Sequence, residues 1–318
     1  MLTGLKIDIV KNINKAFAGS LEKCFICPRR CGVNRVKGKT GYCRASAKVS
    51  IYSYSPHYGE EPPLSGTRGS GTIFFSRCNM KCVYCQNYRF SQLDAGNEIS
   101  IEKLAEIMLS LQAVHCHNIN LVSPTHYVPQ IIAALGIALA QGLDIPITYN
   151  TGGYDLADTL KMLEGAIDIY MPDMRYSDNE MAKRYSDAPD YVEHNRKSVR
   201  EMHGQVGGLV LDKDGIAKKG LIIRLLAMPN NVSGIKGTLE TIKNELGDSQ
   251  YLSIMSQYYP AFKAYAYAEI SHVLTPDEYK NVVDYAKFLG LNNGWTQGSP
   301  AETDPKFFGT NIPQKKGL

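Results

Sequence analysis

From about residue 70 onward, short apolar runs alternate with longer segments in which apolar residues recur every three or four positions. The runs predict strands, whereas the longer segments predict helices. This alternation is typical of an α/β protein with a parallel sheet. Six strands are expected, at about 72–76, 118–123, 146–150, 167–172, 221–228 and 251–257. Helices are expected at about 126–142, 154–164, 178–204, 235–247 and 275–290.

A further helix is expected directly after Ser100, a good N-terminal cap, and it makes a right-handed crossover between the first two strands. The segment 209–220 contains an Asp-Gly turn between short runs and predicts a small hairpin. Residues 1–50 are expected to be irregular. The predicted organisation is a cysteine-rich metal-binding region at 1–55, a main α/β domain at 56–300 and a C-terminal tail at 301–318.

Composition narrows the possible functions. A chain of 318 residues can bury the core of one large domain. The formal net charge of +4 and the pI near 8.5 are too mild to indicate nucleic acid as the main partner. The longest apolar stretch, at 131–140, is about half as long as a membrane span. No secretion signal is visible, so we expect a cytoplasmic protein with reduced thiols.

Three of the eight cysteines, Cys78, Cys82 and Cys85, lie in a short loop directly after the first predicted strand. Three thiolates at this spacing can bind three irons of a [4Fe–4S] cluster and leave the fourth iron open to a substrate or cofactor. Clustered cysteines with reduced thiols indicate metal or redox ligands rather than disulfides. A zinc site and buried free thiols are the alternatives.

A second set, Cys24, Cys27, Cys31 and Cys43, lies near the N-terminus in a glycine-containing segment. Four thiolates indicate a closed site. A second [4Fe–4S] cluster and a structural zinc ion both accept four cysteines, and the spacing does not choose between them. Either metal could serve only to hold this small region together.

The same region is strongly basic. Between residues 23 and 48 it contains eight basic side chains and no acidic one. This charge could offset thiolates, bind an acidic electron donor, or hold an anionic substrate or peptide; a solvated surface around an anionic cluster is the simplest interpretation. The basic residues are Lys23, Arg29, Arg30, Arg35, Lys37, Lys39, Arg44 and Lys48.

The three-cysteine loop, with Tyr84 directly before its last cysteine, resembles that of the radical S-adenosylmethionine (SAM) enzymes. The segments 121–126, 149–154 and 168–173 extend the resemblance to the pyruvate formate-lyase activating enzyme-like proteins. Within these, the chain looks most like an uncharacterised branch with a cysteine-rich N-terminal segment. The resemblance implies a partial (β/α)6 barrel with the cluster at its open end.

The resemblance also implies where SAM binds. In that superfamily the amino and carboxylate groups of SAM chelate the open iron, and the aromatic residue matching Tyr84 lies near the adenine. Asp173 and Arg175 match a segment that meets the SAM carboxylate, and arginine there permits a bidentate bond. The candidate SAM-binding residues are Tyr84, Ser123, Thr125, His126, Asn150, Thr151, Asp173, Arg175, Arg224 and Gln257.

One of these segments departs from the pattern of the activating enzymes, whereas the strand that carries Arg224 resembles their arginine-containing strand beside SAM. Ser123, Thr125 and His126 stand where activating enzymes carry a Gly-Gly-Glu segment that receives the SAM amino group, so the chemistry of that contact has changed. A helix N-cap with a surface histidine is the alternative. Arg224 lies within an apolar strand and needs a partner, either SAM or a structural carboxylate.

The function implied by the resemblance is reductive cleavage of SAM at the cluster, followed by abstraction of a hydrogen atom from a substrate that the sequence does not identify. No side chain is assigned as a catalytic acid or base. Activation of a glycyl radical enzyme is one alternative, and a non-catalytic iron–sulfur or zinc scaffold that binds a partner is another. The expected partners are a reducing electron donor such as flavodoxin or ferredoxin, and a protein or peptide substrate.

Overall fold

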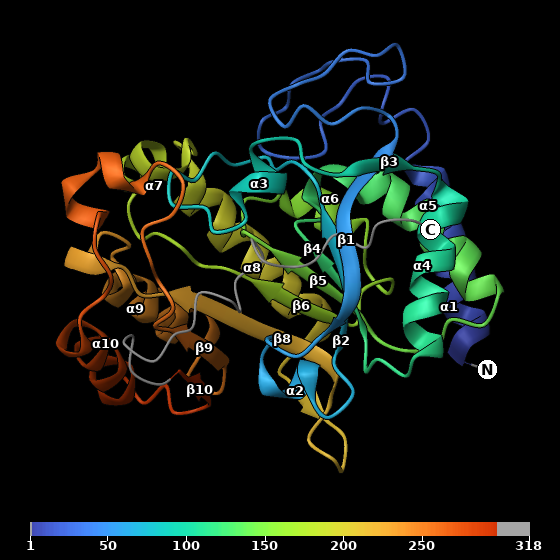
Figure 1. The fold of residues 1–318 in the computed structure, drawn as a ribbon. Helices are drawn as coiled ribbons and strands as arrows, with labels where there is room; N and C mark the ends of the chain where they lie inside the picture. Colours follow the sequence, from blue (N-terminus) through green and yellow to red (C-terminus); the bar gives the residue numbers. More distant parts are fainter. Residues whose placement is uncertain (1, 298–318) are drawn as a thin grey trace.

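The computed structural model describes residues 2–297, which form one extended, mainly parallel sheet covered by helices (Figure 1). The strand order is β10-β9-β8-β6-β5-β4-β2-β1-β3, with β7 paired to β8. The strands are β1 (Val49–His57), β2 (Ser70–Phe75), β3 (Asn97–Ile99), β4 (Ile119–Val122), β5 (Ile147–Thr151), β6 (Ile169–Pro172), β7 (Val210–Leu211), β8 (Ala217–Leu226), β9 (Tyr251–Met255) and β10 (Gly294–Thr296).

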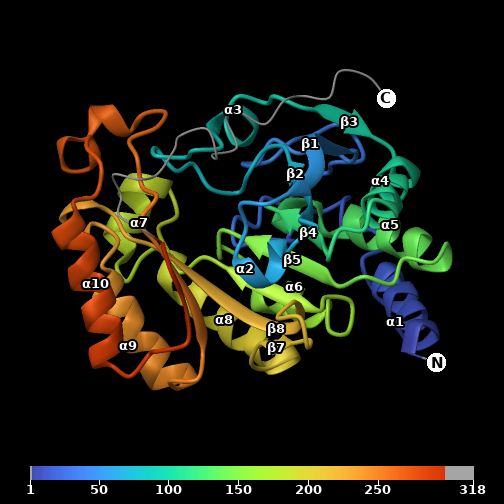
Figure 2. The ribbon, with the colours of Figure 1, turned by 60° about the horizontal axis from the view of Figure 1, so that its bottom comes forward.

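Helices α1, α4 and α5 gather at one end of the sheet, while α7, α9 and α10 lie toward the other (Figures 1 and 2). Within residues 2–297, no helix has the length and apolar composition needed to cross a membrane. The helices are α1 (Leu2–Ala16), α2 (Pro62–Ser65), α3 (Tyr88–Ser91), α4 (Ile101–Ala113), α5 (Val128–Ala140), α6 (Ala157–Lys161), α7 (Asn179–Ser186), α8 (Tyr191–Val206), α9 (Ile235–Leu246) and α10 (Pro276–Phe288).

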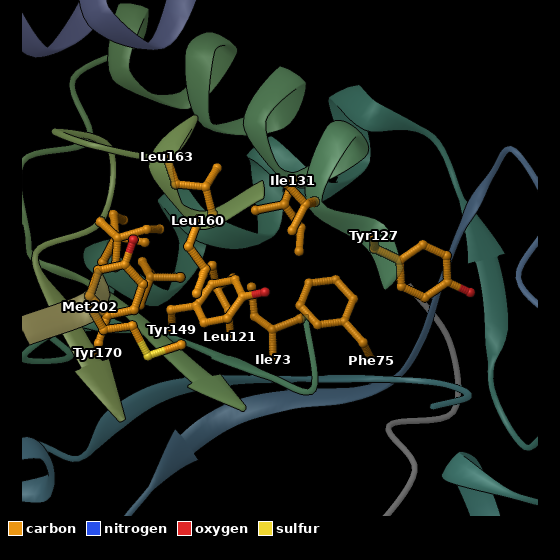
Figure 3. Packing of buried hydrophobic residues seen from close by; sticks show 14 of the residues in the cluster. Ile73, Phe75, Leu121, Tyr127, Ile131, Tyr149, Leu160, Leu163, Tyr170 and Met202 are labelled. Atoms are coloured by element: carbon orange, nitrogen blue, oxygen red, sulfur yellow. The ribbon is translucent and has the colours of Figure 1, made fainter. Parts of the chain in front are cut away.

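The six predicted strands are confirmed as β2, β4, β5, β6, β8 and β9, and every neighbouring pair among them is parallel. In register across the sheet, Ile73, Leu121, Tyr149 and Tyr170 face outward and pack under the helices (Figure 3). The alternate residues therefore face the inside of the curved sheet, because successive side chains of a strand point to opposite faces. The fold class is that of a partial (β/α) barrel.

The predicted hairpin is confirmed as β7 and β8, and Ser100 caps α4 by accepting a hydrogen bond from the Lys103 N–H. The expectation that residues 1–50 are irregular is wrong. Helix α1 occupies Leu2–Ala16 and packs against α5, with Val10 and Ile13 buried in the main core. Its apolar residues follow helical spacing, which is the local signal for this helix.

Strand β1 also departs from expectation, because its range, Val49–His57, spans the predicted domain boundary at residue 55. It pairs antiparallel with β2 and so extends the main sheet. The helix predicted at 178–204 is two helices, α7 and α8. Pro189 lies between them, lacks a backbone N–H and disfavours helical geometry at Ala188, so the helix cannot continue through it. The predicted tail at 301–318 lies outside the described residues.

Candidate functional site

The loop after β2 holds three cysteines whose sulfur atoms all have hydrogen-bonding neighbours. The backbone N–H of Met80 donates to the Cys78 sulfur at 3.4 Å, and the Ser186 hydroxyl donates to the Cys82 sulfur at 3.0 Å. The Cys85 sulfur lies 3.1 Å from a serine hydroxyl at the end of α3. Donors aimed at sulfur stabilise a thiolate, which is the form that binds metal.

Burial works against ionisation of these thiols when no cation is present. Loss of water raises the pKa of Cys78 to about 11 and that of Cys85 to about 12. A bound metal cluster supplies the positive charge that buried thiolates need, so the donor set fits one. No three His, Cys, Asp or Glu side chains among residues 2–297 are grouped closely enough to hold a single metal ion. A cubane instead distributes three thiolates over separate irons.

Two arginines and an aspartate join the cysteine loop to the ends of β5, β6 and β8. Arg175 places Nη1 3.9 Å from the Cys82 sulfur and donates through Nη2 to Asp173 Oδ2 at 2.5 Å. Arg224 donates through Nε to Asp173 Oδ1 at 2.9 Å and through Nη2 to Asn150 Oδ1 at 2.8 Å. Four predicted site residues are therefore brought together beside a cluster cysteine, at the carboxyl ends of parallel strands.

Arg175 has capacity left for a ligand. Its Nε is buried and has no hydrogen-bond partner. The Asp173 carboxylate and the Cys82 sulfur hold the pKa of Arg175 well above its ordinary value despite burial, so its positive charge is secure. A Cβ atom at Gly152 would lie 3.7 Å from this Nε, so the glycine leaves its surroundings open. A carboxylate bound beside the cluster would satisfy the unused donor.

The predicted residues after β4 and β5 are mostly occupied within the protein. Thr125 and Thr151 both donate to the buried Asp155 carboxylate, at 2.8 and 2.6 Å. Ser123 adopts a positive φ of 58° and donates its backbone N–H to the Asn150 carbonyl at 2.8 Å. The two threonine hydroxyls therefore support the fold of these loops, because the Asp155 carboxylate accepts their hydrogen bonds. Ser123 alone of the three β4-end candidates is partly exposed.

His126 is directed away from Arg175. Its Nε2 lies 2.9 Å from the Ser76 carbonyl oxygen, and its residue lines a cavity beside the N-terminal cysteines. Burial lowers the pKa of His126 to about 3, so the ring is neutral. The surface-histidine alternative is wrong, because His126 is only 2% exposed.

Tyr84 and Gln257 make hydrogen bonds to other side chains of the protein. The Tyr84 hydroxyl is 2.7 Å from that of Tyr176, which is 2.7 Å from the Ser186 hydroxyl that donates to Cys82. This chain of hydroxyls makes Tyr84 a remote supporter of the Cys82 thiolate. Gln257 pairs its Oε1 with the Gln297 amide at 3.1 Å.

Comparisons with known proteins agree with this geometry. Residues 72–213, which run from β2 through the cysteine loop to β7, match the family described as the Radical SAM superfamily. The chain belongs to the radical SAM superfamily. It is 30% identical over 301 residues to Uncharacterized protein MJ0674 of Methanocaldococcus jannaschii, covering 92% of this chain and 80% of that protein. MJ0808 of the same organism is 24% identical over 267 residues, covering 76% and 72%.

A solved structure with the same fold is HydG, a maturase of the [FeFe]-hydrogenase. The TM-score is 0.50 at 13% identity, with 73% of this chain covered and 51% of HydG. The chain thus spans about half the length of that maturase, and the likeness concerns the fold alone. The open sheet described above is a radical SAM-type partial barrel, as the resemblance implies. Membership of the activating enzyme-like branch is a narrower prediction than membership of the superfamily.

In this radical SAM protein, the four N-terminal cysteines meet at a second site. The Tyr42 backbone N–H donates to the Cys31 sulfur at 3.3 Å. A Cβ atom at Gly41 would lie only 2.7 Å from the same sulfur, so a glycine is needed for this close approach. Burial raises the pKa of Cys27 to about 12, so its thiolate also needs a cation. Cys24, Cys27, Cys31 and Cys43 line one small cavity together with Ile26, Arg29, Val33, Arg35, Gly41 and His126.

The two cysteine loops pack against each other. Arg29 of the N-terminal loop donates through Nε to the Asn79 carbonyl, 2.9 Å away in the other loop. Its guanidinium stacks 3.6 Å from the centre of the Tyr42 ring, and the Lys81 ammonium lies 5.4 Å from the same ring centre. The N-terminal loop, drawn in blue at the top of Figure 1, is thus fixed to the cluster loop through Tyr42 and Arg29.

The structure places two further charged residues at this site that sequence reasoning missed. Glu60 and Glu61 lie between β1 and α2, and the Glu60 carboxylate is 3.6 Å from Arg224 Nη1. Both side chains are nearly buried, although adjacent glutamates before two prolines look like an exposed loop in the sequence. Arg224 was the available signal, since a buried cation with one identified carboxylate partner can accept another.

Proposed function

We propose that this protein binds a [4Fe–4S] cluster through Cys78, Cys82 and Cys85, binds SAM at the open iron, and abstracts hydrogen from a substrate. The observation that carries the proposal is the placement of Arg175 between the Cys82 sulfur and Asp173, with an unused buried donor. When bound, the cluster and SAM supply one-electron reductive cleavage and a hydrogen-abstracting radical.

The protein's own residues have separable tasks in this proposal. The Arg175 guanidinium would orient the SAM carboxylate, and Asp173 fixes that guanidinium from the opposite side. Arg224 in turn holds Asp173 and Asn150, so the three strand ends move as one unit. The Ser186 hydroxyl donates to the Cys82 sulfur, where its hydrogen bond would tune the cluster.

Reductive cleavage of SAM by protein reconstituted without oxygen tests the proposal. The change Cys82→Ala should abolish cleavage, because it removes one of three protein ligands. Cys116→Ala is the matched control, since Cys116 is a buried cysteine outside both sets. Equal turnover by the Cys82→Ala protein would refute the three-thiol site. Circular dichroism of both variants shows whether a loss of turnover results from a loss of folding.

We also propose that the four N-terminal cysteines hold a metal, either a second [4Fe–4S] cluster or zinc, and that binding of a zinc ion would draw their sulfur atoms closer together than they lie in this structure. Their position around one small cavity supports this. The basic side chains around these cysteines form two groups. Arg29, Arg35 and Arg44 donate hydrogen bonds to backbone carbonyls or to the Asp94 carboxylate. The other basic side chains are exposed. An acidic reducing partner would bind to the exposed group through complementary charge. This group consists of Lys23, Arg30, Lys37, Lys39 and Lys48.

Membership of the activating-enzyme-like branch remains a proposal that rests on the motifs given above. Transfer of label from a candidate glycyl radical enzyme into 5′-deoxyadenosine would support a role as its activase. Label-free product with every such partner would exclude that role while leaving SAM cleavage intact.

A further inference from the structure

Glu60 and Glu61 are held inside the barrel by the turn from β1 into α2. The helix α2 that follows is anchored at the starts of the strands, where Leu64 is fully buried against Ile169 and Ile222. The Glu60 side chain is 9% exposed and Glu61 is 8% exposed. Two adjacent and nearly buried carboxylates therefore lie in the connection between β1 and α2, with Glu60 beside Arg224.

The charges around this pair do not balance. Arg224 already donates to Asp173 and to Asn150, so only Nη1 remains for the glutamates. The charged groups that act most strongly on the pair are Arg224, Asp173 and the two glutamates themselves. Three carboxylates thus face the two guanidiniums of Arg175 and Arg224. The interior carries an excess of negative charge unless a proton or another cation is present.

His57 is the remaining titratable neighbour of the pair. It lies on β1 and Glu61 acts on it, but burial lowers the pKa of His57 below its ordinary value. The imidazole is therefore neutral near pH 7 and adds no positive charge. Burial raises the pKa of both Glu60 and Glu61, as expected for acids without enough cationic partners.

Unsatisfied polar atoms surround the same carboxylates. Asn120 and Thr148 are register neighbours on β4 and β5, and both are fully buried. Neither amide atom of Asn120 makes a well-formed hydrogen bond, although the Asn120 amide lies close enough to the Glu60 carboxylate to act on it. The Thr148 hydroxyl has no partner, and Glu61 Oε2 makes no well-formed hydrogen bond, although the Ser253 side chain acts on the Glu61 carboxylate. A buried polar atom left unpaired costs about 1–3 kcal/mol, so several together indicate that a polar molecule belongs there.

We propose that Glu60 and Glu61, with Asn120 and Thr148, bind the ammonium group of a small polar ligand inside the barrel. An ammonium group neutralises the excess charge, and its three donors match carboxylate and amide oxygens. An anionic or wholly apolar ligand meets repulsion or unpaired atoms at the same place. The assignment rests on the proposed function, because that function makes the barrel interior a reaction chamber.

Two molecules could supply this group, a substrate amine and SAM itself. Binding measurements on the reconstituted holoprotein separate them. The probes are SAM and, with SAM already bound, n-butylamine, n-butanol and butyrate, each followed by calorimetry. The variants are Glu61→Gln and Glu60→Gln, which keep the shape and remove the charge. Glu106→Gln, on the exposed face of α4, is the matched control.

If the ligand is a substrate amine, butylamine should bind, whereas butanol and butyrate should not. The Glu61→Gln change should then lower the affinity for butylamine at least about tenfold and leave the affinity for SAM unchanged. For SAM, the same substitution should weaken SAM by a similar factor and leave butylamine without a site. If neither ligand responds to either substitution, the pair binds only protons or water and the assignment is overturned.

Failure of the ammonium-site assignment can be distinguished from failure of the proposed function. Reductive cleavage of SAM needs no substrate, so it is measured without added amine on the unaltered protein and on the Glu106→Gln control. Absence of cleavage in the unaltered protein would instead overturn the proposed function. Because burying an uncompensated charge is costly, both substitutions should leave the melting temperature unchanged or raise it. A fall in melting temperature with no change in ligand binding would identify the glutamates as structural.

Discussion

The two cysteine sites use the same donor atom in opposite surroundings. The Cys78 loop follows a central strand and has Arg175, Asp173 and Arg224 beside it, which leaves one side lined by charged groups. The N-terminal site instead has a fourth cysteine and is closed by its own loop and by His126. This difference indicates that the number of thiols and the groups beside them together distinguish a reactive site from a closed one.

The sites also differ in what holds them in place. The Cys78 loop is fixed by the sheet and by α7, through Ser186. The segment that carries the N-terminal cysteines has turns and little regular structure. Its main internal support is Arg35, 2% exposed, which donates to the Ser46 carbonyl and to the His126 carbonyl. We therefore expect metal loss to disorder the N-terminal loop far more than the barrel.

The largest expected effect is on the closed site. The double change Cys27→Ala and Cys31→Ala should remove all of its metal and make the N-terminal loop sensitive to proteases, because this loop consists of turns and has little regular secondary structure of its own. Metal analysis and limited proteolysis measure both results. The iron bound by Cys78, Cys82 and Cys85 should remain. Loss of all iron would show that the two sites are not separable.

Changing Arg175→Met should weaken SAM binding by about 10- to 100-fold, as expected for loss of one charge-assisted bidentate contact. Calorimetry on reconstituted protein gives the affinity. Arg184→Met is the control, since Arg184 is 53% exposed and pairs with Glu269 at the surface. Equal affinities in the two variants would remove Arg175 from the SAM site.

Changing Arg35→Met should lower the free energy of unfolding by about 2–4 kcal/mol, because two buried carbonyls lose a charged donor. Urea unfolding of the metal-loaded protein measures this change. Arg200→Met, which removes an exposed ion pair with Glu245, should cost less than about 1 kcal/mol. Similar costs for both would mean that Arg35 does not support the closed site.

The smallest effect concerns the hydroxyl beside Cys82. The change Ser186→Ala should make the reduction potential of the SAM-binding cluster more negative by tens of millivolts, since a hydrogen bond to sulfur favours the reduced form. One tenfold change in a one-electron equilibrium is about 59 mV. A redox titration followed by electron paramagnetic resonance measures the shift, and an unchanged potential would contradict the assigned contact.

The sequence allowed the barrel strands and the cluster loop to be predicted, because continuous apolar runs and clustered cysteines are local signals. It also placed Asp173, Arg175 and Arg224 at neighbouring strand ends, which the parallel register brings together. Local sequence signals did not predict the separate contacts of adjacent residues that face different sites. Thr125 and His126 are neighbours in a 3-10 turn, yet one contacts Asp155 and the other the closed site.

Other features were hidden because they depend on distant contacts. Glu60 and Glu61 have the sequence surroundings of a surface loop, and only the path of β1 into α2 buries them. The role of Arg35 was equally hidden among eight basic residues, since its partners are backbone carbonyls that any sequence contains. Such residues are recognised by what surrounds them in space.

The central claim is that SAM binds at the three-cysteine site and not at the four-cysteine site. Electron paramagnetic resonance of the reduced protein, with and without SAM, tests it most directly. We expect a cluster signal that changes when SAM is added, both in the unaltered protein and after Cys27→Ala and Cys31→Ala. This SAM-dependent signal should be absent after Cys82→Ala. A SAM-dependent signal that survives Cys82→Ala and disappears in the N-terminal variant would contradict the account.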